Sequence, residues 1–131
     1  MVSPTKSQLV HRALRRRCPY CGAKDLFSSW LKMRRHCPTC GLATDRVVGH
    51  WIGAVGVNTM VTFGLMFAVL FGFLIGTYPD IHLVPLLPAT IAIAVLFPLL
   101  FWPCSQTLWT AIDIMLRPVT PPELDPRYLG R

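Results

Sequence analysis

Two long stretches of the chain contain no charged side chain. No Lys, Arg, Asp or Glu occurs from 47 to 79, and none occurs from 81 to 112. Because about 20 apolar residues cross the hydrocarbon core of a bilayer as a helix, we expect transmembrane helices over 51–78 and 83–102. The short connection between them contains Asp80 and no Lys or Arg. The pattern therefore predicts an α-helical transmembrane hairpin.

The alternative interpretation is a helical hairpin buried in the core of a soluble protein. The chain has only 131 residues, which is too few to surround two such long apolar helices with a polar shell. In a bilayer, by contrast, a helix pairs its own backbone N–H and C=O groups and needs no protein shell. The membrane interpretation is therefore preferred.

A different pattern follows the second apolar stretch. Over 104–117, apolar residues fall on one side of a helix and polar residues mostly on the other, after a proline at position 103. Proline ends or bends a helix, so this segment is expected to form a separate amphipathic helix at the membrane interface. On it, Asp113 and Arg117 have the spacing of a helical ion pair. The proline-rich segment 118–131 is expected to be a flexible tail.

Positive charge is concentrated at the N-terminal end of the chain. Residues 1–50 carry ten of the 13 Lys and Arg residues, whereas 51–116 carry none. The positive-inside rule then places both termini in the cytoplasm. The basic segment 1–17 is expected to form a short amphipathic helix near anionic lipid headgroups.

The first apolar stretch has a repeating set of small residues. They recur every four positions, as Gly64, Ala68, Gly72 and Gly76. Small residues on one face let a second helix approach closely, so this face predicts contact with a membrane-protein partner or a second copy of the chain. Asn58 needs a hydrogen-bond partner within hydrocarbon, so we expect it to face another helix or the interface, as a packing contact rather than a transport site.

Residues 18–50, ahead of the spans, contain two matching motifs: Cys18-Pro19-Tyr20-Cys21-Gly22 and Cys37-Pro38-Thr39-Cys40-Gly41. Each Cys-x-x-Cys turn can direct both sulfurs at one point, so four thiolates can complete a tetrahedral metal site. Cytoplasmic thiols stay reduced, which favours metal binding over disulfides. The sequence therefore predicts a small zinc ribbon with structural Zn²⁺ held by Cys18, Cys21, Cys37 and Cys40.

Two other chemistries compete for these cysteines. Iron is held by similar paired motifs in rubredoxins, although this chain lacks their acidic character. A thiol–disulfide site, as in glutaredoxins with Cys-Pro-Tyr-Cys, would need a βαβ pattern that is not evident before residue 50. Between the motifs, several apolar residues are expected to form a small floor around a hairpin: Leu26, Phe27, Trp30, Leu31 and Met33. The lone Cys104 is expected to be an apolar filler.

On these residues the chain resembles a bacterial family known as "domain of unknown function 983". The resemblance rests on the paired Cys-Pro-x-Cys-Gly motifs, on Leu26-Phe27 and Leu31-Lys32 between them, and on the two apolar spans that follow. It covers roughly 14–117. It implies a zinc-ribbon-like protein with two membrane spans and names no activity. Some members are encoded near respiratory oxidase genes, which implies a link to the assembly of membrane complexes.

The sequence does not predict an enzyme. It shows no nucleophile beside a base, no paired carboxylates and no phosphate-binding loop. We expect a non-catalytic inner-membrane protein that acts as an interaction, adaptor or accessory subunit. One alternative is a metal-handling or redox assembly factor for a respiratory complex. Another is a membrane-tethered ribbon that binds nucleic acid, although the membrane topology already explains the basic charge.

Overall fold

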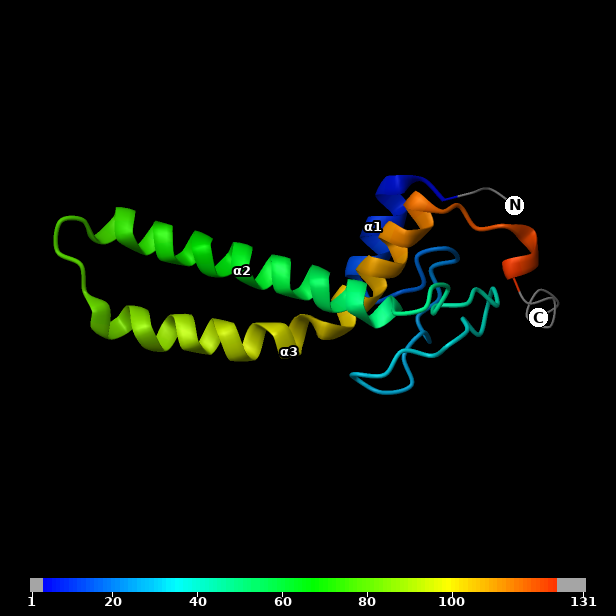
Figure 1. Ribbon diagram of the computed structural model, residues 1–131, viewed down its shortest axis with the longest axis horizontal. Helices are drawn as coiled ribbons and strands as arrows, with labels where there is room; N and C mark the ends of the chain where they lie inside the picture. Colours follow the sequence, from blue (N-terminus) through cyan, green and yellow to red (C-terminus); the bar gives the residue numbers. More distant parts are fainter. Residues whose placement is uncertain (1–3, 125–131) are drawn as a thin grey trace.

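The computed structural model describes residues 4–124 as an elongated molecule with two unlike ends (Figure 1). Its helices are α1 (Lys6–Leu14), α2 (His50–Thr77), α3 (Leu83–Leu116) and the one-turn 3₁₀ helix η1 (Pro121–Glu123). Helices α2 and α3 lie antiparallel and form the predicted hairpin. We call the end of the molecule where α2 begins and α3 ends the cap. It comprises residues 4–49, the last turns of α3 from residue 104, and residues 117–124.

Both helices of the hairpin are long and apolar enough to cross a membrane. They contain 28 and 34 residues, and a helix rises about 1.5 Å per residue against a hydrocarbon core of about 30 Å. The connection that joins them, 78–82, lies at the far end from the cap (Figure 1). The chain therefore leaves the cap along α2 and returns to it along α3.

Close contact between α2 and α3 is concentrated near the cap. A side chain at Gly53 would overlap the indole ring of Trp109, so only glycine lets the two helices approach here. One turn further along α2, the buried Asn58 donates a hydrogen bond from Nδ2 to the carbonyl oxygen of Pro98 at 2.9 Å. Thr62 in turn donates to the Asn58 carbonyl at 2.7 Å.

The small-residue face of α2 does not take part in this contact. Gly64, Ala68, Gly72 and Gly76 are all exposed. Apart from the backbone of α2 itself and the neighbouring residues, no described atom comes within 4 Å of a Cβ built on any of the three glycines. The face that the sequence predicts to receive a helix is thus open, and α3 occupies a different side of α2.

Helix α3 corrects the prediction of a separate helix over 104–117. It continues through Pro88, Pro98 and Pro103 to Leu116. Figure 1 shows that its last turns run at a steep angle to the rest and lie beside α1. A proline inside a helix removes a backbone hydrogen bond and bends the axis, but packing can keep the helix continuous. Here the hydroxyl of Thr107 donates to the Ala13 carbonyl of α1 at 2.8 Å.

The last turns of α3 bury polar side chains against the rest of the protein. The polar residues Thr110 and Asp113 are buried, whereas the apolar Leu116 is 73% exposed. Their partners come from the start of α2 and from the segment before it: Nε2 of His50 lies 3.3 Å from the Thr110 hydroxyl, and Arg46 pairs with Asp113 at 3.2 Å. The polar face therefore packs on the protein, and Asp113 pairs with Arg46 instead of Arg117.

The interior of the cap is small and is built around the cysteines. Its buried apolar side chains come from α1, from segment 15–49, from α3 and from the segment after α3: Leu9, Ala13, Leu26, Leu42, Ala111, Ile114 and Leu124. Between the cysteine motifs the chain makes the expected tight turn, with an antiparallel bridge between Phe27 and Met33. Only part of the predicted floor is buried, because Trp30 and Leu31 at the tip of this turn are 51% and 54% exposed.

Residues 118–124 fold back onto segment 15–49, unlike the flexible tail predicted over 118–131. Leu124 is 5% exposed and forms a bridge with Leu42. Glu123, in η1, accepts a hydrogen bond from Arg46 at 2.8 Å. A buried leucine and an ion pair fix this segment despite its prolines. Residues 125–131 of the predicted tail lie outside the described residues.

Candidate metal centre

The two Cys-x-x-Cys motifs fold into nearly identical turns. In the first, Cys18 N–H donates to the Ala23 carbonyl at 2.9 Å, and Gly22 N–H donates to the Cys18 carbonyl at 2.8 Å. In the second, Cys37 N–H donates to the Leu42 carbonyl at 3.0 Å, and Gly41 N–H donates to the Cys37 carbonyl at 2.9 Å. The repeated sequence thus gives a repeated structure, and each turn presents its two sulfurs on the same side.

Glycine is required after each motif because the backbone turns there into the left-handed region. The φ angles are +83° at Gly22 and +71° at Gly41. Residues with a Cβ rarely adopt such angles, whereas glycine does so without steric cost. These two glycines reverse the chain directly behind the second cysteine of each pair, which keeps both sulfurs directed inwards.

The four sulfurs meet at one point. All four Sγ atoms lie within 4.8 Å of one another. Across the two turns, Cys18 and Cys40 are separated by 3.8 Å, and Cys21 and Cys37 by 3.6 Å. Metal–sulfur bonds of about 2.3 Å place the sulfurs of a tetrahedral site about 3.8 Å apart. The separations therefore fit a metal ion bound by four thiolates, and they are too long for disulfide bonds.

The closeness of the sulfurs makes their ionisation unequal. Interaction with the Cys21 thiol, then with Cys37, raises the pKa of Cys18 well above its usual range. Interaction with Cys18 lowers the pKa of Cys21 to about 7, and it lowers that of Cys37 as well. Protons therefore gather on some sulfurs and negative charge on others. A bound cation replaces the shared protons and lets all four sulfurs act as thiolate ligands.

A helix supports the first cysteine turn from behind. Arg12 of α1 donates from Nη1 to the Tyr20 carbonyl at 2.7 Å and to the Pro19 carbonyl at 3.4 Å. Its guanidinium also lies against Gly22. Arg12 brings positive charge to the centre and satisfies backbone carbonyls that the turn leaves free. In the sequence, only the position of Arg12 on a basic segment just before the motif indicates this role.

The second cysteine turn is supported by Thr44. Its hydroxyl donates to the Arg34 carbonyl at 2.6 Å, and its N–H donates to the Arg35 carbonyl at 2.8 Å. Thr44 is 3% exposed. These bonds join the strand-like segments on either side of the turn and fix its direction. The bridge between His36 and Ala43 lies in the same place.

The remaining cysteine and the nearest histidine lie outside the cluster. Cys104 Sγ lies 3.8 Å from the Leu14 carbonyl, at the junction of α1 and α3. His36 is exposed although it precedes Cys37. The cluster thus consists of the four cysteines that the sequence singles out. Four protein ligands complete a tetrahedral site, so such a centre has no free position for water or substrate.

The sequence model of one protein family matches residues 27–113, which is more than half of the chain; its description is "Protein of unknown function (DUF983)". The chain belongs to the DUF983 family. No curated protein and no solved structure matches it. The matched range contains the second cysteine turn and almost all of the hairpin. Cys18 and Cys21 precede that range, and the fold joins them to the part of the chain that defines a DUF983 protein.

Proposed function

We propose that this DUF983 protein is a non-catalytic adaptor or accessory subunit of the bacterial inner membrane, whose cytoplasmic cap is organised by structural zinc. The observation that carries the proposal is the arrangement of four cysteines on one end of a two-helix hairpin. The cap is too small to fold around an apolar core alone. A metal held by four thiolates supplies the missing stability and leaves no coordination site for catalysis.

Exposure of the hairpin supports its placement in a membrane. In the most apolar window of each helix, only 6% of the residues are buried. A helix from the core of a soluble protein would be mostly buried, because exposing apolar side chains to water costs about 25 cal/mol per Å². Lipid removes this cost. The cap carries the basic residues and the distal connection carries none, which supports a cytoplasmic cap.

The open small-residue face supports a role in binding another membrane helix. Gly64, Ala68, Gly72 and Gly76 leave α2 accessible along a line that α3 does not cover. In hydrocarbon, small residues promote helix association because they let two backbones come close. The cap would then hold a cytoplasmic surface of the complex at a fixed distance from the membrane.

The first experiment concerns the membrane and the metal. The full-length protein, expressed in bacteria, should stay with membranes after an alkaline carbonate wash. Elemental analysis of the detergent-purified protein should give one zinc per chain that a chelator removes slowly. Iron in place of zinc would overturn the metal assignment. Rapid loss of metal to a weak chelator would favour metal handling instead of a structural role.

The second experiment concerns the adaptor role. Gly72→Leu should reduce the size of the complex that the protein forms in mild detergent, measured by native gel electrophoresis and mass spectrometry. Ala92→Leu is the matched control, because it enlarges an exposed small residue on α3. Equal complexes for the wild type and both variants would contradict helix docking through this face.

A further inference from the structure

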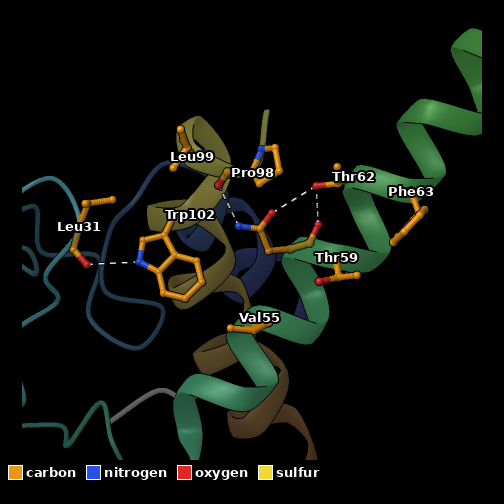
Figure 2. A pocket seen from close by; sticks show the side chains of 9 residues that line it. Leu31, Val55, Thr59, Thr62, Phe63, Pro98, Leu99 and Trp102 are labelled. Carbon is orange, nitrogen blue, oxygen red and sulfur yellow. Dashed lines mark hydrogen bonds between the residues drawn. The ribbon is translucent and has the colours of Figure 1, made fainter. Parts of the chain in front are cut away.

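An apolar groove lies between α2 and α3 next to the cap. It has a volume of about 480 Å³. Figure 2 shows its walls, with Val55 and Phe63 from α2, Leu99 and Trp102 from α3, and Leu31 from the cap. The indole N–H of Trp102 donates to the Leu31 carbonyl at 3.3 Å and so fixes the turn of the cap against α3.

A second cavity, of a different character, shares Leu31 with this groove. It has a volume of about 250 Å³ and lies between the cap and the first turn of α2. Lys32 and Arg35 bring positive charge to it, and Asp45 brings one negative charge. His50 and Gln106 line the same cavity. An apolar groove that meets a charged cavity at one residue suits a ligand with an apolar chain and a charged head.

Two buried polar atoms of this cavity indicate the chemistry of the headgroup that it would accept. His50 Nδ1 and Gln106 Oε1 have no hydrogen-bond partner among residues 4–124. The Thr110 hydroxyl donates its hydrogen to the backbone carbonyl of Gln106 at 2.9 Å. The hydroxyl oxygen can then only accept from the imidazole, so His50 Nε2 is the donor to Thr110. Nδ1 of a neutral imidazole is then an acceptor, as Gln106 Oε1 is. Buried acceptors left unpaired cost about 1–3 kcal/mol each. The cavity therefore favours a ligand that brings hydrogen-bond donors as well as an anion.

We propose that the groove and the cavity together bind one aminophospholipid, of the phosphatidylethanolamine type. An acyl chain lies in the groove, and the phosphate lies by Lys32 and Arg35. The ammonium group donates towards Asp45, His50 Nδ1 and Gln106 Oε1. The two cations match the phosphate, and the three acceptors match the ammonium. This inference rests on the membrane placement proposed above, which brings lipid to the open side of the groove.

The test uses the full-length protein in nanodiscs that contain equal parts of phosphatidylethanolamine, phosphatidylglycerol and diacylglycerol. After extraction into mild detergent, native mass spectrometry counts the lipids that stay bound. We expect one phosphatidylethanolamine per chain. Equal retention of phosphatidylglycerol would overturn the role of the amine. Retention of diacylglycerol alone, or of no lipid, would overturn the site.

Two pairs of variants locate the lipid. Lys32→Gln with Arg35→Gln should lower retention at least about tenfold, the effect of one lost charged hydrogen bond, whereas Arg15→Gln with Lys24→Gln should not. Thr59→Trp fills the groove and should also release the lipid, whereas Met60→Trp lies on an exposed face outside it. Unchanged retention in both test variants would contradict the site. Metal content and membrane recovery of each variant show separately whether the fold and the membrane placement are intact.

Discussion

The cap and the hairpin of this DUF983 protein obtain their structure in opposite ways. Segment 15–49 contains isolated β-bridges and turns but, among the described residues, no helix or extended strand. Its shape depends on four sulfurs and a few buried side chains. The hairpin consists of two regular helices whose many apolar side chains face outwards. Most of those side chains pack against no fixed partner in the protein, whereas the cysteines and buried side chains of the cap do. Single substitutions should therefore act strongly in the cap and weakly in the hairpin.

A junction connects the two regions and shares features of both. Arg46 of the cap reaches Asp113 and the Arg117 carbonyl at the end of α3. His50, at the start of α2, lies against Thr110. These contacts are specific, and they join segment 15–49 and the start of α2 to the last turns of α3. The junction should respond to substitution more than the spans and less than the metal centre.

The largest effect is expected at the metal centre. Cys37→Ser removes a buried ligand, and with it most of the free energy of metal binding, which in small zinc domains is about 10–16 kcal/mol. The variant should lose bound metal, and residues 18–49 should become sensitive to protease while the hairpin stays in the membrane. Elemental analysis and limited proteolysis measure both. Cys104→Ser is the control, because Cys104 lies outside the cluster; loss of metal in that variant would contradict the assignment.

The next largest effect is expected at the junction. Arg46 and Asp113 have side chains only 7% and 8% exposed. Arg46→Met leaves the Asp113 carboxylate buried without its partner, which costs about 3–5 kcal/mol for such pairs. Thermal unfolding in detergent, followed by circular dichroism, should show a clearly lower midpoint. Arg117→Met should leave the midpoint unchanged, because Arg117 is exposed and Asp113 pairs elsewhere. A lower midpoint for Arg117→Met together with an unchanged midpoint for Arg46→Met would instead support the Asp113–Arg117 pair that the sequence alone predicts.

The features that can be predicted from the sequence are those that depend on short local patterns of residues. Two uncharged stretches gave the hairpin, and two copies of Cys-Pro-x-Cys-Gly gave the cysteine cluster, because spacing alone determines which atoms can meet. The Arg46–Asp113 pair joins residues 67 positions apart. Nothing in either local segment marks the other as its partner. The sequence could show that Asp113 needs a cation, but it offered the nearer Arg117.

The course of α3 was harder to predict for a related reason. Proline at 103 marks a bend or an end, and the choice depends on what packs against the following turns. Here α1 and Arg46 provide that packing, and the polar face turns inwards to meet them. The sequence does not single out Gly53, because the repeating glycines further along α2 form the stronger pattern. Its role depends on Trp109, which the bend of α3 brings to it.

A smaller effect tests the contact between the two helices. Gly53→Ala places a methyl group against the Trp109 ring, which must move, and such overpacking costs about 1–3 kcal/mol. Gly56→Ala is the matched control, because no described atom lies within 4 Å of a Cβ at that position. Unfolding in increasing concentrations of a denaturing detergent should show that Gly53→Ala is less stable than Gly56→Ala. Equal stability would place the close approach of α2 and α3 elsewhere.

The smallest effect is expected from the polar contact inside the span. Asn58→Leu keeps a similar volume and removes the hydrogen bond to the Pro98 carbonyl. Polar contacts between membrane helices contribute about 0.6 kcal/mol on average, because the separated helices also find partners. The variant should therefore unfold only slightly earlier than the wild type. Thr59→Val, on the exposed side of the same turn, gives the baseline. A loss as large as that of Arg46→Met would mean that the hairpin, like the cap, depends on single residues, and the contrast between the two regions would fail.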